Sequence, residues 1–263
     1  MVCSSHILSL LVAGCLLASA AAAGTNYCTG VTCPSGTQHT MCLYPSAGPS
    51  SSCSQPNAAA STVSAADISE ILAAHNTIRE AVRTGKYASN NLPAASEMPP
   101  LAWDAELATV AQRWADQCQQ SHDQCRAVPR FAVGQNAAWT WGHAKNWTGR
   151  AIGQWFHDEL PHFQQSNLTF TQGTDRVSGQ IIGHLTQVIW ASTTLVGCGY
   201  TETVDTDFYN LTKRAYFCNY GPAGNFIGQQ IYRPEVTAAG TTAPPTATPS
   251  AGTTGAPTTH SSC

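Results

Sequence analysis

The sequence has little charge for its length. Only 10% of the 263 residues are charged, against about 25% in an average soluble protein. The 12 Lys and Arg do not outnumber the 15 Asp and Glu. Proteins that bind nucleic acid by neutralising phosphates need a surplus of basic residues, so this balance argues against a nucleic-acid partner.

Long apolar runs are also missing, except for one near the N-terminus. Residues 7–22 are apolar and end in the small residues of 18–23, which is typical of a secretory signal peptide with cleavage before Gly24. The run is short for a membrane span and lacks a stop-transfer pattern, although an N-terminal anchor remains the alternative. We therefore predict a signal peptide at residues 1–23 and no transmembrane span in the mature, secreted chain.

The 11 cysteines lack the closely paired spacing of zinc-cysteine sites. Cys3 and Cys15 lie in the predicted signal peptide, and Cys263 is the last residue, where it is a free thiol, an intermolecular bridge or part of a trimmed end. Eight remain, which in a secreted chain indicate four disulfides among 105 pairings. They are Cys28, Cys33, Cys42, Cys53, Cys118, Cys125, Cys198 and Cys218.

The two ends of the mature chain differ in composition from its middle. Residues 236–263 carry no charge and are rich in Thr, Ala, Pro, Gly and Ser, which predicts a disordered, mucin-like tail. Residues 24–63 combine cysteines with few apolar side chains, which predicts a segment that wraps the main domain of residues 64–235. Three sequons mark potential N-glycosylation sites at Asn146, Asn167 and Asn210.

Helical periodicity comes first in the main domain and strand-like segments come later. A capping box at Ser64 and Asp67 precedes apolar residues at helical spacing, and Gly85 can end that helix. Further helices are expected from Asp104 and around residues 152–160, the latter broken by Pro161. Strands are expected at residues 184–190, 195–200 and 214–220, which together indicate an α+β fold.

Three polar side chains fall on apolar faces of these elements. His75 lies mid-helix, and alternation places His184 on the buried face of a strand. Glu159 returns to the apolar stripe of its helix, whereas Asp158 lies about 100° away from it. Two imidazoles and a carboxylate could hold zinc or copper, and the alternative is that each histidine is buried and satisfied by a hydrogen bond.

Four segments resemble the CAP superfamily of cysteine-rich secretory, antigen five and pathogenesis-related proteins. The resemblance rests on residues 183–192 (GHLTQVIWAS), 216–226 (YFCNYGPAGNF), 75–79 (HNTIR) and 134–136 (GQN). The N-terminal cysteines and residues 114–126 look most like arthropod venom antigen five and salivary proteins.

The resemblance implies a three-layer α-β-α sandwich with a mostly antiparallel sheet. It implies the disulfides Cys28–Cys42, Cys33–Cys125, Cys53–Cys118 and Cys198–Cys218. It also implies a polar cleft able to bind zinc, formed by His75, Gln135, Glu159 and His184. Gln135 stands where the family has an acid. The family spacing from Trp155 would favour Asp158, but a match of the following residues 159–163 favours Glu159 with one inserted residue, in agreement with the apolar stripe.

The resemblance implies a secreted, non-catalytic protein that binds a lipid, a sterol or an extracellular or host protein, with no required cofactor and at most weak zinc at His75, His184 and Glu159. The alternative is a metal-dependent hydrolase or protease, since three protein ligands and an open position would suit catalytic zinc. No nucleophile elbow or HExxH motif is present. A channel-blocking toxin is disfavoured because no further cysteine-rich module follows the shared domain.

Overall fold

The computed structural model describes residues 25–236. The predicted signal peptide, the tail beyond residue 236 and Cys263 lie outside this range. No helix within it is both long enough and apolar enough to cross a membrane.

A four-stranded sheet forms the middle layer, in the order β1-β3-β4-β2. The long antiparallel hairpin of β3 (Leu195–Asp205) and β4 (Leu211–Gly221) is flanked by β2 (Gly134–Trp141), antiparallel to β4. The two-residue β1 (Ala102–Trp103) adds a parallel edge beside β3, so the sheet is mixed. The predicted strands at 195–200 and 214–220 lie within β3 and β4, whereas sequence analysis assigned no strand to β2.

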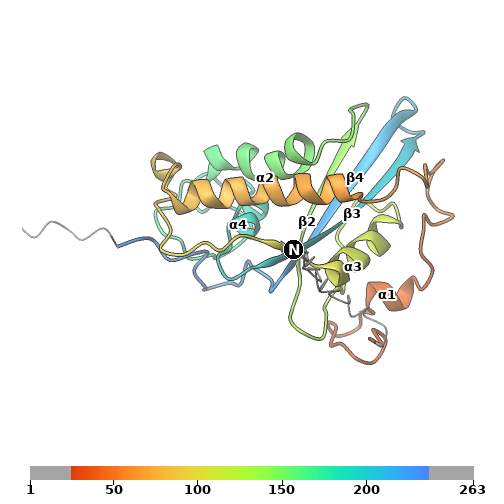
Figure 1. Ribbon diagram of the computed structural model, residues 1–263, viewed down its shortest axis with the longest axis horizontal. Helices are drawn as coiled ribbons and strands as arrows, with labels where there is room; N and C mark the ends of the chain where they lie inside the picture. Colours follow the sequence, from red (N-terminus) through yellow and green to blue (C-terminus); the bar gives the residue numbers. More distant parts are fainter. Residues whose placement is uncertain (1–24, 237–263) are drawn as a thin grey trace, which may run out of the picture.

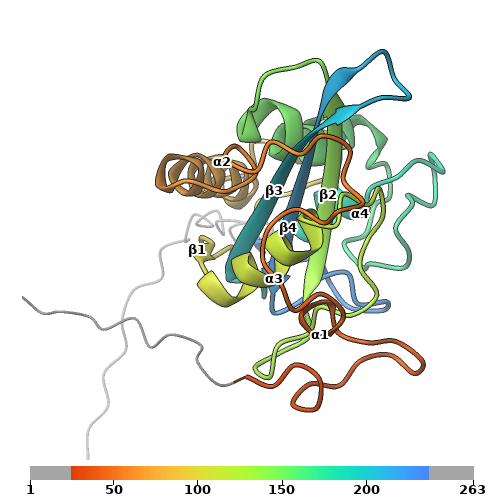
Figure 2. The ribbon, with the colours of Figure 1, turned by 90° about the vertical axis from the view of Figure 1, so that its right-hand side faces the viewer.

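Helices cover both faces of this sheet, as Figures 1 and 2 show. On one face α2 (Ala65–Arg83) packs with the helical segments of residues 148–162 and with α4 (Gly183–Val188), burying Ile71, Trp155, Val188 and Tyr220 in the main core. The other face carries α3 (Ala105–Ala115), whose Trp114 joins a smaller cluster with Phe217. This is the expected three-layer α+β sandwich.

Local signals set the ends of the first long helix. Ser64 and Asp67 form the capping box of α2, each side chain bonded to the other's backbone N–H. At the other end, Gly85 has the left-handed backbone conformation typical of glycine, and its N–H bonds the Val82 carbonyl at 3.0 Å. The helix therefore begins and ends as the sequence predicts.

The φ angle of Gly85 is +75°, in the left-handed region, and the Lys86 N–H bonds the Ala81 carbonyl one turn back. These two bonds together make the Schellman pattern that commonly closes a helix. A residue with a Cβ would be strained at this position.

Residues 184–190, predicted as a strand, belong instead to helix α4 (Gly183–Val188) and the turn that follows it. Leu185, Thr186, Gln187 and Val188 are all buried in α4, so polar and apolar residues do not alternate between solvent and core there. The alternation in the sequence therefore carried no information about solvent exposure. The carbonyls of Val188 and Trp190, which a strand would pair, instead accept hydrogen bonds from Arg79.

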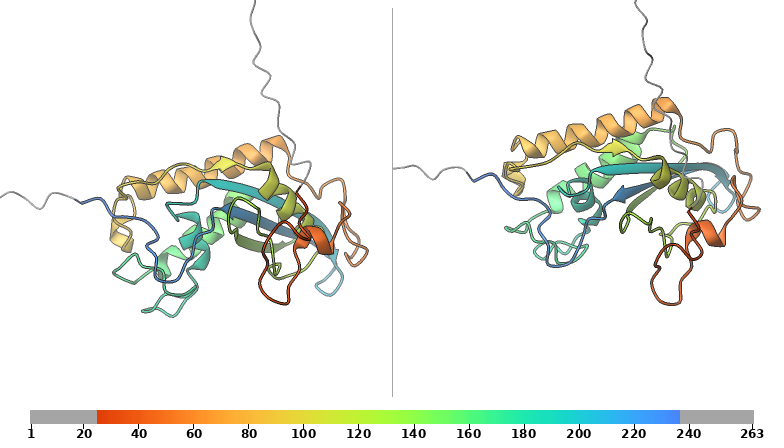
Figure 3. Two further views of the ribbon diagram at one scale, coloured as in Figure 1. Left: turned by 90° about the horizontal axis from the view of Figure 1, so that it is seen from below. Right: turned by 60° about the horizontal axis from the view of Figure 1, so that its bottom comes forward.

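The expected helix around residues 152–160 is present in a wider form. Two π-helical turns, Thr148–Ile152 and Gln154–Asp158, precede a 3₁₀ turn at Leu160–His162 that contains Pro161. The Gly153 N–H bonds to the Thr148 carbonyl five residues earlier, which is the π pattern. Among the described residues, the first helical turn is α1 (Thr40–Leu43), which lies near α3 (Figure 3).

Four disulfides connect the described cysteines in the pairing that the family resemblance implies. Cys28–Cys42, Cys33–Cys125 and Cys53–Cys118 tie residues 25–63 to themselves and to the chain after α3. Cys198–Cys218 joins directly opposite residues of β3 and β4. Backbone bonds such as Asn57 N–H to the Glu202 carbonyl also hold the N-terminal segment against β3.

Helix α3 approaches the sheet most closely at the glycines of β3. A Cβ on Gly199 would lie 2.3 Å from the Gln112 backbone nitrogen. We expect Gly199→Ala to lower the free energy of unfolding by about 3 kcal/mol, because helix and strand must separate to make room. Urea denaturation with the disulfides intact measures this change.

Gly173→Ala is the matched control, since no heavy atom lies within 4 Å of its added Cβ. Equal stability of the two variants would contradict this account of the α3–sheet contact.

Candidate functional site

Glu159 and His184 form one half of a polar site. Glu159 is buried at the end of the π-helical segment, and its Oε1 accepts a hydrogen bond from His184 Nδ1 at 2.5 Å. Its Oε2 accepts the Leu185 backbone N–H at 2.8 Å, at the start of α4. Asp158 is exposed, so Glu159 is the acid bonded to His184, as the helical periodicity indicated.

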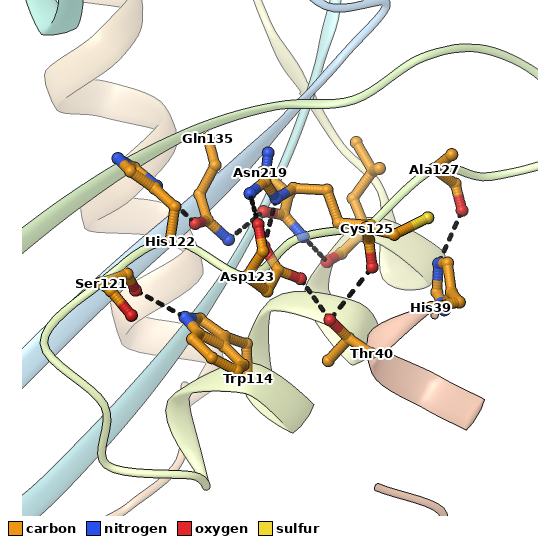
Figure 4. A network of polar contacts seen from close by, with 12 residues as sticks. His39, Thr40, Trp114, Ser121, His122, Asp123, Cys125, Ala127, Gln135 and Asn219 are labelled. Carbon is orange, nitrogen blue, oxygen red and sulfur yellow. Dashed lines mark hydrogen bonds and ion pairs between the residues drawn. The ribbon is translucent and has the colours of Figure 1, made fainter. Parts of the chain in front are cut away.

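The other half of the site is a chain of hydrogen bonds on the α3 side of the sheet (Figure 4). The Asn219 amide donates to the Leu107 carbonyl, and its oxygen accepts from the Gln135 amide. That leaves Gln135 Oε1 to accept from His122 Nδ1 at 2.7 Å. A backbone carbonyl at one end therefore sets the direction of every bond up to the histidine.

Disulfides and an ion pair hold the segment that carries His122. Cys118 and Cys125, on either side of it, are bridged to Cys53 and Cys33. The neighbouring Asp123 is 4% exposed, pairs with Arg126 and accepts a hydrogen bond from the Thr40 hydroxyl. His122 is therefore held in place although its ring is partly exposed.

Strand β2 connects the two halves. Gln135 accepts from His122, and the next residue, Asn136, donates its amide N–H to the His184 carbonyl at 3.1 Å. Loss of water around the ring lowers the pKa of His122, against the opposing effect of the Gln135 bond. In both histidines Nδ1 forms the hydrogen bond to the neighbouring side chain, which leaves Nε2 as the free ring nitrogen.

His75 lies in the core and does not join this site. Its Nδ1 bonds the Ile71 carbonyl at 2.8 Å, and its Nε2 bonds the Tyr220 hydroxyl at 2.9 Å. The residue is fully buried, so both ring nitrogens are used where no ligand can reach. The expectation that His75 contributes to the cleft is wrong. Its position on the apolar face of α2 places it in the core, where the Ile71 carbonyl and the Tyr220 hydroxyl bond both ring nitrogens.

Sequence analysis missed His122, although the sequence contains a signal for it. His122 lies between two cysteines and 13 residues before Gln135. A histidine in a segment closed at both ends by disulfides has a fixed position without being part of a helix or strand. Helical or strand periodicity gives no signal for this residue, because His122 lies outside any helix or strand.

The donor set does not fit a catalytic zinc with three protein ligands. Within residues 25–236 no three His, Cys, Asp or Glu side chains come together as a metal-binding group, so the expected His75, His184 and Glu159 site is not formed. Both oxygens of Glu159 already accept hydrogen bonds. What the site offers is two imidazoles, each oriented by a neighbouring side chain.

A pocket of about 300 Å³ opens beside His184. Its wall combines the apolar side chains of Trp139, Trp155 and Ile181 with the polar side chains of Glu159 and His184. The pocket borders the free edge of β2, where Trp155 donates its indole N–H to the Ala137 carbonyl.

Comparison with known proteins identifies the family. The model of the CAP family, described as the cysteine-rich secretory protein family, matches residues 72–220. The chain belongs to the CAP family. It is 41% identical over 214 residues to "Venom allergen 3" of Solenopsis invicta, covering 79% of this chain and 89% of that protein. It is also 41% identical over 202 residues to "Venom allergen 5" of Brachyponera chinensis, covering 75% and 98%.

Solved structures agree with this family and with the fold. "Crystal structure of NaASP2 with Zn2+" matches with a TM-score of 0.53 and 29% identity, covering 66% of this chain and 88% of that one. "Structure of BmVAL-1" matches with a TM-score of 0.53 and 28% identity, covering 65% and 84%. The resemblance to arthropod venom allergens found in the sequence is confirmed by the two venom allergens that are 41% identical to this chain.

Burial of His75 predicts a pH dependence of stability. Burial lowers the pKa of His75 to about 4, below the 6.5 of a free histidine. The unfolded chain therefore binds a proton that the folded chain rejects, so the free energy of unfolding should fall by roughly 3 kcal/mol as the pH drops from about 6.5 to about 4. Denaturation curves of the native chain across this range measure the fall.

His75→Gln should be less stable at neutral pH but should lose this part of the acid sensitivity. Identical pH dependence in the native chain and the variant would contradict the assignment of the effect to His75.

Proposed function

We propose that this chain is a secreted, non-catalytic binding protein whose polar site, together with the adjoining pocket, recognises an extracellular partner. The apolar N-terminal run and the four disulfides support secretion, since disulfides persist in oxidising compartments. The similarity to proteins named venom allergens supports the same setting.

The observation that carries the proposal is how the polar side chains of the site are already used. Glu159 has both oxygens occupied, and Gln135 uses both ends of its amide. In covalent catalysis, a general base normally bonds a nucleophile such as Ser or Cys. Here the side-chain partners of His122 and His184 are an amide and a carboxylate, which fix the orientation of each ring.

The pocket size favours a protein partner. A volume of about 300 Å³ is at the lower limit for small-molecule sites and would not enclose a sterol. It can accept a protruding side chain, with the carboxylate and imidazole supplying polar contacts at its edge. The partner class that this fits is an extracellular or host protein.

A lipid or sterol is a second candidate ligand, supported by a different pocket. A volume of about 670 Å³ lies among residues 96–99, 190–194 and 229–233, with Trp190, Ile231 and Tyr232 in its wall. This is within the usual range for small-molecule sites. Lipid binding by this chain would therefore use this pocket and not the one beside His184.

Zinc provides a test of the hydrolase alternative. One related structure is titled as a complex with Zn2+. In this chain we propose that zinc binds weakly through His122 and His184 Nε2, because Gln135 contributes no charge. Gln135→Glu would give His122 the carboxylate partner that His184 has in Glu159, and such partners raise metal affinity 10–100-fold.

We therefore expect titration calorimetry to give weak zinc binding for the native chain and at least about tenfold tighter binding for Gln135→Glu. His184→Ala should bind no zinc, whereas His75→Gln, the control, should bind as the native chain does. Equal binding by all four proteins would contradict this description of the site.

The proposed function itself is tested by a screen for peptidase and esterase activity, with and without a chelator, and by mass spectrometry of lipids that co-purify. We expect no chelator-sensitive hydrolysis by the native chain. Hydrolysis that is lost in both His122→Ala and His184→Ala would show that the site is catalytic.

A further inference from the structure

The hairpin that joins β3 to β4 ends in an exposed aromatic pair. Phe208 and Tyr209 are 48% and 84% exposed, with ring centroids 5.3 Å apart. Figure 2 shows this hairpin extending beyond the helices that cover the sheet. Exposing large aromatic side chains to water at a projecting turn costs free energy, so a group that covers this pair would stabilise the turn.

The backbone of this turn has an unusual and fixed shape. Tyr209 and Asn210 both have φ of +54°, and the Leu211 N–H bonds the Phe208 carbonyl at 3.1 Å. Two successive left-handed residues closed by this bond are characteristic of a type I′ turn. Asp205 fixes the approach to the turn by accepting the N–H groups of Asp207 and Phe208.

Asn210 begins a sequon at this turn, Asn210-Leu211-Thr212. The turn exposes Asn210 directly beside the aromatic pair. Asn and Thr are two residues apart, and Phe208 is two residues before the Asn, so aromatic ring, amide and hydroxyl follow one another along a single turn. A sugar attached to Asn210 would emerge next to the only large apolar surface of the turn.

The other two sequons are placed differently. Asn146 uses its side-chain oxygen to accept the Gly149 N–H at the start of a helical segment, and Trp147, the middle residue of its sequon, is fully buried. Asn167 accepts the Thr169 N–H, and Leu168 is 7% exposed. Neither sequon has an exposed aromatic residue just before its Asn.

We propose that Asn210 carries an N-linked glycan whose first sugar packs on the Phe208–Tyr209 pair and stabilises the hairpin. The inference depends on the chain entering a secretory compartment, as the proposed function requires. There Asn210 Nδ2 attacks C1 of an oligosaccharide carried on a lipid diphosphate. The N–C1 bond forms as the C1–O bond breaks, the amide loses one proton, and the lipid diphosphate leaves with the bonding electrons.

The glycan would stabilise the folded state through the apolar face of the sugar ring. Covering Phe208 and Tyr209 removes apolar surface from water, and this happens only when the hairpin holds the rings beside Asn210. The stabilisation should therefore require both the glycan and the rings, so that removing either one removes the same interaction.

The test uses the full chain, secreted from a eukaryotic host behind a heterologous signal peptide, so that its result is independent of residues 1–23. Peptide mapping after enzymatic glycan release in ¹⁸O-water reads the occupancy of Asn210, which we expect to be high. An unmodified Asn210 would overturn the proposal without bearing on the binding function.

Thermal unfolding then compares the glycosylated native chain with Asn210→Gln, in the native background and with Phe208→Ser and Tyr209→Ser. Asn210→Gln should lower Tm by roughly 2–4 °C more in the native background than without the rings, because the strain of Gln at a φ of +54° is common to both backgrounds. Asn167→Gln is the control and should have the same effect in both backgrounds. An equal loss of Tm from Asn210→Gln with and without the rings would overturn the stacking.

Discussion

The guanidinium of Arg79 lies on the inner side of α2 and is 1% exposed, yet none of the carboxylates in residues 25–236 pairs with it. It donates instead to the backbone carbonyls of Pro99, Val188, Trp190 and Thr193. Burial lowers the pKa of Arg79 to about 10, which still leaves it charged at neutral pH. Because a buried charge must be satisfied, these carbonyls are held where α4 ends, and the position of His184 at the start of α4 depends on that arrangement.

The same reliance on backbone groups governs the polar site. The Leu107 carbonyl sets the direction of the bonds through Asn219 and Gln135 to His122, and the Leu185 N–H sets which oxygen of Glu159 receives His184. Backbone groups of the helices thus determine which ring nitrogen of each histidine is left without a hydrogen bond. The disulfides add what regular structure does not supply, since they fix a segment between α3 and β2 that has few backbone bonds of its own.

Sequence patterns predicted the parts of the molecule that carry a local signal. The capping box of α2 was predicted from Ser64 and Asp67, the two long strands from their residue types, and the inward-facing Glu159 from helical periodicity. The patterns failed where burial is complete on every side, as in α4, whose residues carry no periodic signal. They also failed for His75 and His122, because whether a histidine is satisfied in the core or presented at a surface depends on Tyr220 and Gln135, which are distant in sequence.

The central claim is that backbone anchors hold His122 and His184 in one tautomer, with the proton on Nδ1 and Nε2 free for a partner. Long-range ¹H–¹⁵N correlation spectra of the ¹⁵N-labelled chain near pH 8 report the tautomer of each histidine directly. The account predicts protonated Nδ1 and unprotonated Nε2 for both rings, with His122 changing in Gln135→Ala and His184 unchanged. A protonated Nε2 in either ring of the native chain would contradict it.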